Sequence, residues 1–75
     1  MSYLIEQKVR KMLEERGIQQ KFICEKVGIS TALFNLSMNC KRKLKATELI
    51  SICFVLGIDL NEFKNLEDGG NDGQN

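Results

Sequence analysis

Hydrophobic residues recur every three or four positions along most of this chain, which is the pattern of amphipathic helices. Near the start they occupy Ile5, Val9, Met12 and Leu13, with polar residues between them. This spacing predicts a first helix that buries one face. Gly17, which accepts left-handed backbone without a side-chain clash, predicts where that helix ends.

A second run of this kind lies in the C-terminal half, at Leu49, Ile52, Cys53 and Leu56. Gly57 predicts the end of its helix. A last helix is expected to begin at Asp59, because Glu62 follows three residues later in a pattern close to a capping box. With two short helices in residues 20–37, the chain predicts an all-α fold of five helices, and its 75 residues suffice for one small core.

Residues 20–37 have the spacing of a helix-turn-helix, two short helices joined by a tight turn. In the first of these helices, Ile23 and Val27 supply the inward apolar side chains, and Cys24 is small enough for a close helix crossing. Gly28 supplies the positive φ that ends the helix. Ile29 is the apolar residue that anchors the turn in the core.

The second short helix is expected to start at Ser30, whose hydroxyl can accept a hydrogen bond from a backbone N–H of the first turn. Phe34 would anchor this helix from beneath. Since a helix-turn-helix typically places its second helix in the major groove, DNA binding is the leading interpretation.

From about Val9 to Phe63 the chain resembles the Cro and lambda-repressor type helix-turn-helix family. The resemblance is carried by Arg10, Gly17-Ile18-Gln19-Gln20, Val27-Gly28-Ile29-Ser30, Asn39, Lys41-Arg42, and Leu56-Gly57-Ile58 before Leu60. It implies a compact, lambda-repressor-like domain and a phage or bacterial transcriptional regulator that binds operators as a dimer. It also implies that Gln20 and the loop after the recognition helix contact the DNA backbone.

Four cations lie within five residues just past the recognition helix: Lys41, Arg42, Lys43 and Lys45. Phosphate contacts from such side chains position a protein on DNA and make its affinity salt-dependent. Gln20, followed by Lys21, lies at a helix N-terminus, where backbone N–H groups favour another phosphate. Alternatively, the basic run is simply a solvated loop. We expect Ser30 and Asn39 at the edges of the same DNA interface.

The helical wheel directs Ala32 and Leu36 outward when Phe34 faces the core, with Thr31 and Asn35 beside them. Asn35 can pair with adenine, and Ala32 or Leu36 can pack on a thymine methyl group, so we expect an A/T-leaning site. Two alternatives stay open. The face that Leu36 forms with Leu33 can instead bind a protein, as in an antirepressor or the small subunit of a complex, or the chain is a non-specific DNA binder.

At several positions the chain departs from the family. Leu13 and Met38 stand where relatives often pair a base with an acid, and a packed apolar pair is an acceptable replacement for a buried ion pair. Cys40 stands where relatives usually have glycine, which indicates left-handed backbone, and Ser37 stands where an apolar residue is common. At the exit from this second helix the chain therefore departs from the family pattern, and the basic loop can be aimed differently.

Helix 49–56 is apolar nearly all round, because Ile50 and Phe54 form a second stripe opposite its core face. With Phe63 nearby, this stripe is a candidate dimer or partner surface, since identical patches close on a two-fold axis. Alternatively, the last helix or Tyr3-Leu4 covers it. A dimer would present two recognition helices about 34 Å apart and bind a pseudo-palindromic operator.

Charge divides the chain unevenly. Residues 1–64 hold all 11 Lys and Arg and 7 of the acids, a net of +4, whereas the total is +1. The acidic, glycine-rich residues 66–75 predict a disordered tail after a domain of residues 1–65.

Catalysis and metal binding find no support. The chain has no histidine, its cysteines 24, 40 and 53 lack Cys-x-x-Cys spacing, and acids such as Glu48 are scattered over expected helix surfaces. We therefore expect no metal, cofactor or small-molecule ligand. An odd cysteine count without a signal peptide indicates a reducing cytoplasm, and no segment is long enough to span a membrane.

Overall fold

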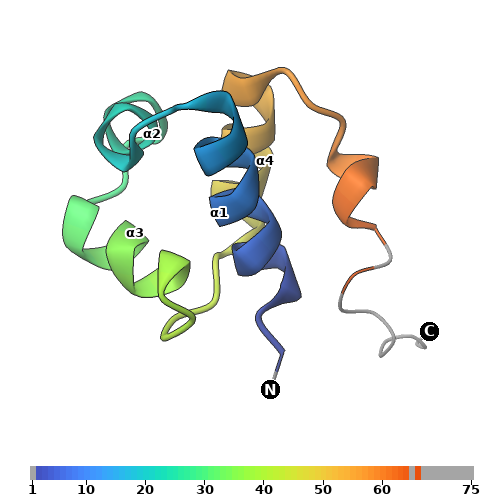
Figure 1. Ribbon diagram of the computed structural model, residues 1–75, viewed down its shortest axis with the longest axis horizontal. Helices are drawn as coiled ribbons and strands as arrows, with labels where there is room; N and C mark the ends of the chain where they lie inside the picture. The colour runs from blue at the N-terminus through green and yellow to red at the C-terminus, as the bar shows by residue number, and fades with distance from the viewer. Residues whose placement is uncertain (1, 65, 67–75) are drawn as a thin grey trace.

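Four α-helices and one short 3₁₀ helix make up the computed structural model (Figure 1), which describes residues 2–64 and residue 66. The elements are α1 (Leu4–Arg16), α2 (Gln20–Val27), α3 (Thr31–Met38), α4 (Ala46–Leu56) and η1 (Leu60–Phe63). The expected acidic tail falls, apart from residue 66, outside the described residues. The all-α expectation is confirmed for the described part of the chain.

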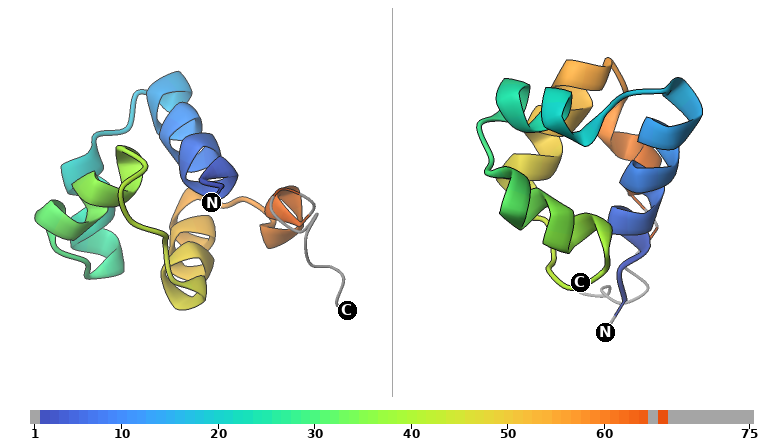
Figure 2. Two further views of the ribbon diagram at one scale, coloured as in Figure 1. Left: turned by 90° about the horizontal axis from the view of Figure 1, so that it is seen from below. Right: turned by 60° about the vertical axis from the view of Figure 1, so that its left-hand side comes forward.

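The helices enclose a core to which every helix and η1 contribute. Its buried residues are Val9, Leu13, Ile23, Cys24, Phe34, Met38, Leu49, Ile52, Cys53 and Phe63. Phe34 and Ile23 are the largest of the side chains that are fully buried. Figure 2 shows α1 and α4 on one side of the domain and the α2–α3 unit on the other, so α3 lies at the outside of the fold.

The expected fifth α-helix is instead a four-residue 3₁₀ helix. Its backbone bonds span three residues, from Glu62 N–H to Asp59 O at 2.9 Å and from Lys64 N–H to Asn61 O at 3.1 Å. The Asp59 carboxylate accepts from Asn61 N–H at 2.9 Å, two residues on, rather than from the third residue as a capping box requires. The prediction of five α-helices was therefore wrong by one element.

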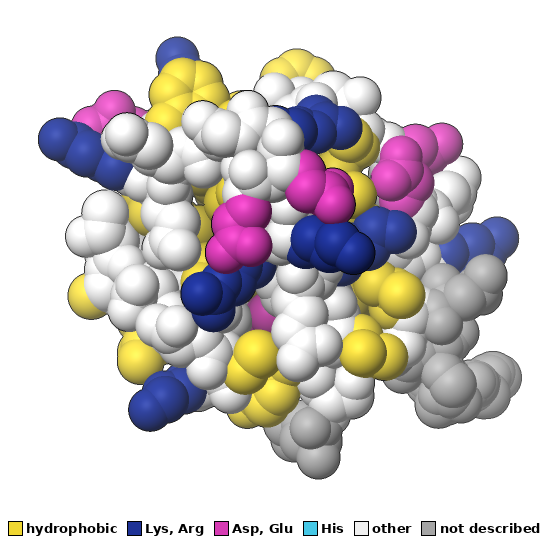
Figure 3. All heavy atoms as spheres, viewed as in Figure 1, with side chains coloured by type: hydrophobic (Ala, Val, Ile, Leu, Met, Phe, Trp, Pro, Cys, Tyr) yellow, Lys and Arg dark blue, Asp and Glu magenta, His cyan; other side chains and the backbone are white. Residues whose placement is uncertain are grey.

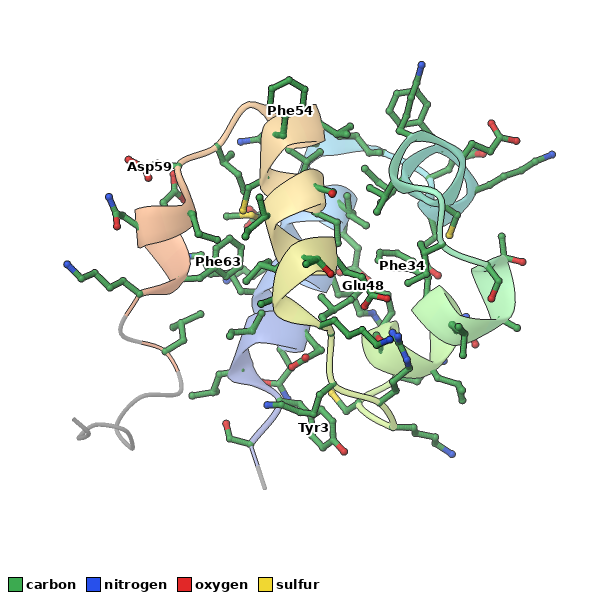
Figure 4. The ribbon with its side chains drawn as sticks, turned by 180° about the vertical axis from the view of Figure 1, so that it is seen from behind. Tyr3, Phe34, Glu48, Phe54, Asp59 and Phe63 are labelled. Carbon is green, nitrogen blue, oxygen red and sulfur yellow. The ribbon has the colours of Figure 1, made fainter. Side chains whose placement is uncertain are left out.

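Phe63 is another correction. It is 4% exposed and belongs to the core, so it does not line a dimer surface as expected. Lys8 covers it, with Nζ at 5.5 Å from the ring centroid, while the same ammonium donates to Glu62 O. Because η1 turns its one aromatic side chain inward (Figure 4), the apolar stripe on α4 loses this neighbour.

The stripe itself is open. Ile50 is 51% exposed and Phe54 is 87% exposed, and the Phe54 ring points away from the body of the domain in Figure 4. Neither η1 nor the N-terminal Tyr3-Leu4 covers Phe54, which contradicts the alternative in which they do.

The apolar pair of α1 and α3 is packed as expected. Leu13 is 3% exposed and Met38 is 1% exposed. Arg10 links the same two helices from outside, because its Nη1 donates to Met38 O at 3.3 Å while its Nε contacts Glu14 at 3.1 Å. The two helices are therefore joined by burial and by the hydrogen bond from Arg10 to Met38.

Candidate nucleic-acid interface

The turn between α2 and α3 has the local geometry that the sequence predicts. Gly28 has φ +83° and donates its N–H to Cys24 O at 2.8 Å, which closes α2. Ser30 Oγ accepts from Leu33 N–H at 3.1 Å and caps α3. Phe34 is fully buried beneath the helix. The core thus fixes which face of α3 points to solvent.

That outward face is exposed and uncharged. Thr31, Ala32, Asn35 and Leu36 are all exposed, with Leu36 at 41%. Asn39 Nδ2 donates to Asn35 Oδ1 at 3.0 Å. This bond occupies the Asn35 oxygen from one side and leaves its side-chain N–H groups available to an acceptor in the groove. The face therefore offers amide and hydroxyl hydrogen bonds beside methyl groups, a combination suited to base edges.

The N-terminus of α2 is open. Gln19, which precedes the helix, makes no side-chain cap, so first-turn N–H groups of α2 are not satisfied in this way. Gln20 is half-buried and Lys21 is exposed at this end. Backbone N–H groups beside a cation attract an anion such as a DNA phosphate.

The segment of residues 39–45, the basic loop, leaves α3 through a sharp turn. Cys40 is the non-glycine residue with positive φ among those described, at +61°, as the glycine of relatives led us to expect. Its N–H bonds to Ser37 O at 3.1 Å, and Lys41 N–H bonds to Leu36 O at 2.8 Å. Ser37 is fully buried at this exit.

Arg42 points into the protein. Its Nη1 donates to the buried Ser37 Oγ at 3.0 Å, and its Nη2 lies 2.9 Å from Glu48 Oε2. The two paired side chains are only 18% and 17% exposed. Glu48 was expected on a helix surface, but it is half-buried because the loop covers it.

The Glu48 carboxyl is also bonded to the loop backbone, since its Oε1 accepts from Lys45 N–H at 2.9 Å. Desolvation by itself raises the pKa of Glu48. The hydrogen bonds from Arg42 and Lys45 N–H, together with the two positive charges, outweigh it, so the pKa of Glu48 is lowered overall.

Lys43 is engaged as well. Its ammonium donates to Ser2 O, lies 5.3 Å from the centroid of the Tyr3 ring, and lies 3.9 Å from Glu6 Oε1. Sequence reasoning did not single out Glu6. The sequence nevertheless indicates that Glu6 is buried. It lies three and seven residues before Val9 and Leu13, which places all three on the inward face of the helix.

The four expected phosphate ligands of the basic loop therefore fall into two pairs. Arg42 and Lys43 contact carboxylates of the protein, whereas Lys41 and Lys45 are exposed. In Figure 3, Lys and Arg side chains lie over α2 and below α3, with polar and hydrophobic side chains between them. Such an arrangement, in which cations flank a neutral helix face, is complementary to a DNA groove, whose uncharged base edges lie between two phosphate backbones.

The cysteines lie apart from this interface or at its edge. Cys24 and Cys53 are buried, and burial raises the pKa of both thiols. Cys40 is half-buried in the basic loop. Within residues 2–64 and 66, no group of three His, Cys, Asp or Glu side chains is placed to hold a metal ion.

In the described part of the chain, no helix has both the length and the apolar character needed to cross a bilayer. Searches of curated proteins and of solved structures found no significant match. A family model, that of the Cro/C1-type helix-turn-helix DNA-binding domain, matches residues 8–69, which include all but the first four residues of α1 and the whole of α2, α3, α4 and η1. The chain belongs to the Cro/C1-type helix-turn-helix DNA-binding family.

Proposed function

We propose that this protein is a sequence-specific, repressor-like transcriptional regulator that places α3 in the major groove of DNA. Membership of a DNA-binding family gives the general function. The observation that carries the finer proposal is the exposed, uncharged outward face of α3, together with the exposed cations Lys21 on α2 and Lys41 just past the end of α3. We propose that the protein acts in the bacterial cytoplasm and is encoded by the bacterium or by a phage.

In this proposal phosphates are bound at the N-terminus of α2 and in the basic loop after α3. The N-terminus of α2, with Gln20 and Lys21, holds one DNA strand, and Lys41 and Lys45 hold the other. Ser30 and Asn39 lie at the edges, where a hydroxyl and an amide can reach sugar-phosphate oxygens. Arg42 and Lys43 leave the set of direct contacts because their charged groups already have partners.

Bases are read by Thr31, Ala32, Asn35 and Leu36. The methyl-bearing side chains Ala32 and Leu36 favour thymine. Asn35 donates to a base acceptor, because its oxygen is bonded to Asn39. We therefore propose a site that leans to A/T base pairs.

We propose that the protein binds DNA as a homodimer with two-fold symmetry. Ile50 and Phe54 supply an apolar stripe on α4, outside the DNA face, that a second copy can cover. The two α3 helices would then lie about 34 Å apart, and the operator would be pseudo-palindromic.

One observation favours a second candidate, a protein-interaction module. Leu33 and Leu36 are 44% and 41% exposed on α3, where a hydrophobic partner can contact them. In this case α3 binds an antirepressor target or a larger complex instead of DNA.

Selection from random duplex DNA at physiological salt tests the proposal. Enrichment of a two-fold symmetric, A/T-leaning motif supports a dimeric regulator. Retention without a motif would establish non-specific binding, and no retention would direct attention to the Leu33 and Leu36 face.

A further inference from the structure

A buried carboxylate lies beneath the basic loop. Glu6, from the first turn of α1, is 1% exposed, and its Oε2 accepts from Leu44 N–H at 2.6 Å. Its Oε1 lies 3.9 Å from Lys43 Nζ and accepts no hydrogen bond from the described residues. Because a buried charge is costly unless it is paired, this carboxylate requires the loop to stay in place.

The N-terminal segment also contacts the Lys43 ammonium. Ser2 O accepts from the Lys43 ammonium, and the Tyr3 ring lies against it. Figure 4 shows Tyr3 beside the loop at the end of the domain where α1 begins. Three groups from residues 2–6 therefore surround one side chain of the loop, which is far away in sequence.

The opposite side of the loop is held by Glu48, through Arg42 and the N–H of Lys45. The two side chains bound to carboxylates, those of Arg42 and Lys43, thus lie between Lys41 and Lys45, whose side chains are exposed. A loop fixed in this way loses less conformational entropy when its cations meet phosphate.

We propose that Glu6 is a positioning residue for DNA-backbone binding, and that Lys43 is its anchor within the protein rather than a phosphate ligand. The inference rests on the proposed function. Glu6 holds Lys43 and Leu44 so that Lys41 and Lys45 are presented to phosphates on either side. The N-terminal segment and the basic loop form one unit of the DNA interface.

The sign of a charge change tests the role of Glu6. Removing a negative charge should strengthen binding to DNA if only the overall field matters. We expect Glu6→Gln to weaken binding of a random-sequence duplex about fivefold. The matched control is Glu15→Gln, which makes the same charge change at an exposed position of α1 and should leave binding equal or slightly tighter. Equal tightening by both variants would overturn the proposal.

The salt dependence of binding tests the role of Lys43. Lys41→Ala should reduce the slope of log affinity against log salt by about 0.9, the value for one phosphate contact. Lys43→Met should weaken binding with a change of slope below about 0.3, because its cation does not meet phosphate. A slope change in Lys43→Met as large as that in Lys41→Ala would show that Lys43 binds DNA directly.

A measurement without DNA separates this inference from the proposed function. We expect the Leu44 amide, which donates to Glu6, to exchange with solvent about tenfold faster in Glu6→Gln than in the unmodified protein, while the Ile52 amide inside α4 keeps its rate. Unchanged exchange at Leu44 would remove the positioning role, whether or not DNA binds. Faster exchange in a protein that binds no DNA would leave the contact established and would sink the proposed function alone.

Discussion

Arg42 Nη2 and Glu48 Oε2 lie 2.9 Å apart at the start of α4, in a pair that is more than four-fifths shielded from solvent. The pair closes the basic loop against the helix that follows it. Arg42, which the sequence predicts to be a phosphate ligand, therefore holds the basic loop against α4.

The pair should make stability depend on pH. Because the folded pKa of Glu48 is below its ordinary value of 4.5, its contribution is fully present above that value and is lost as the pH falls through the folded pKa. Glu48→Gln should reduce the free energy of unfolding by about 1 kcal/mol at pH 7. Urea titrations from pH 7 down to pH 3 should show the two proteins converging at the acid end. A constant difference across this range would contradict the assignment.

Cys40 carries backbone strain that glycine would relieve. At φ +61° a residue with a Cβ costs about 1 kcal/mol more than glycine. We expect Cys40→Gly to raise the melting temperature by about 4 °C or more, as measured by circular dichroism. Cys40→Ala is the control, because alanine keeps the Cβ, and it should show no such gain.

The Asn35–Asn39 pair should set base preference at one position. Asn35→Ala removes the proposed donor to a base and should relax preference at one base pair by about 1 kcal/mol, the value of a single hydrogen bond. Asn39→Ala frees the Asn35 oxygen, so it should change which base is preferred rather than abolish the preference. Sequencing of selected duplexes for both variants measures this. If the selected motif is the same for all three proteins, α3 does not read bases through Asn35.

Phe54 should control self-association. Replacing this exposed ring by serine removes the largest apolar contact from the proposed dimer surface without disturbing the core. Sedimentation equilibrium should show Phe54→Ser as a monomer at concentrations where the unmodified protein is dimeric. Phe22→Ser, which changes another exposed phenylalanine on α2, should leave the dimer intact. A monomeric unmodified protein would rule out this surface as a DNA-independent dimer contact.

The helix-turn-helix was readable from sequence because each of its signals acts locally. Gly28 ends α2, Ser30 bonds to an N–H three residues later, and Phe34 points into the core. The 3₁₀ geometry of η1 was not readable, since a capping Asp before four residues fits the start of either kind of helix.

The division of the four cations depends on distant contacts. Glu6 is 38 residues away from Leu44 in sequence, and no local sequence pattern predicts the contact between them. The role of Glu48 was closer to hand, because an acid three residues after Lys45 is placed to accept the Lys45 N–H at a helix start. Sequence could thus locate the basic loop but not say which of its charges face outward.

The contact between Ser2 and Lys43 bears on how the protein is handled and fused. Any polypeptide placed before Ser2, whether an affinity tag or a further domain, enters beside the loop that is proposed to meet DNA. A bulky or acidic extension there would compete for Lys43 and shield Lys41 from phosphate. We therefore expect an acidic tag before Ser2 to weaken DNA binding more than a neutral tag of the same length at the same end.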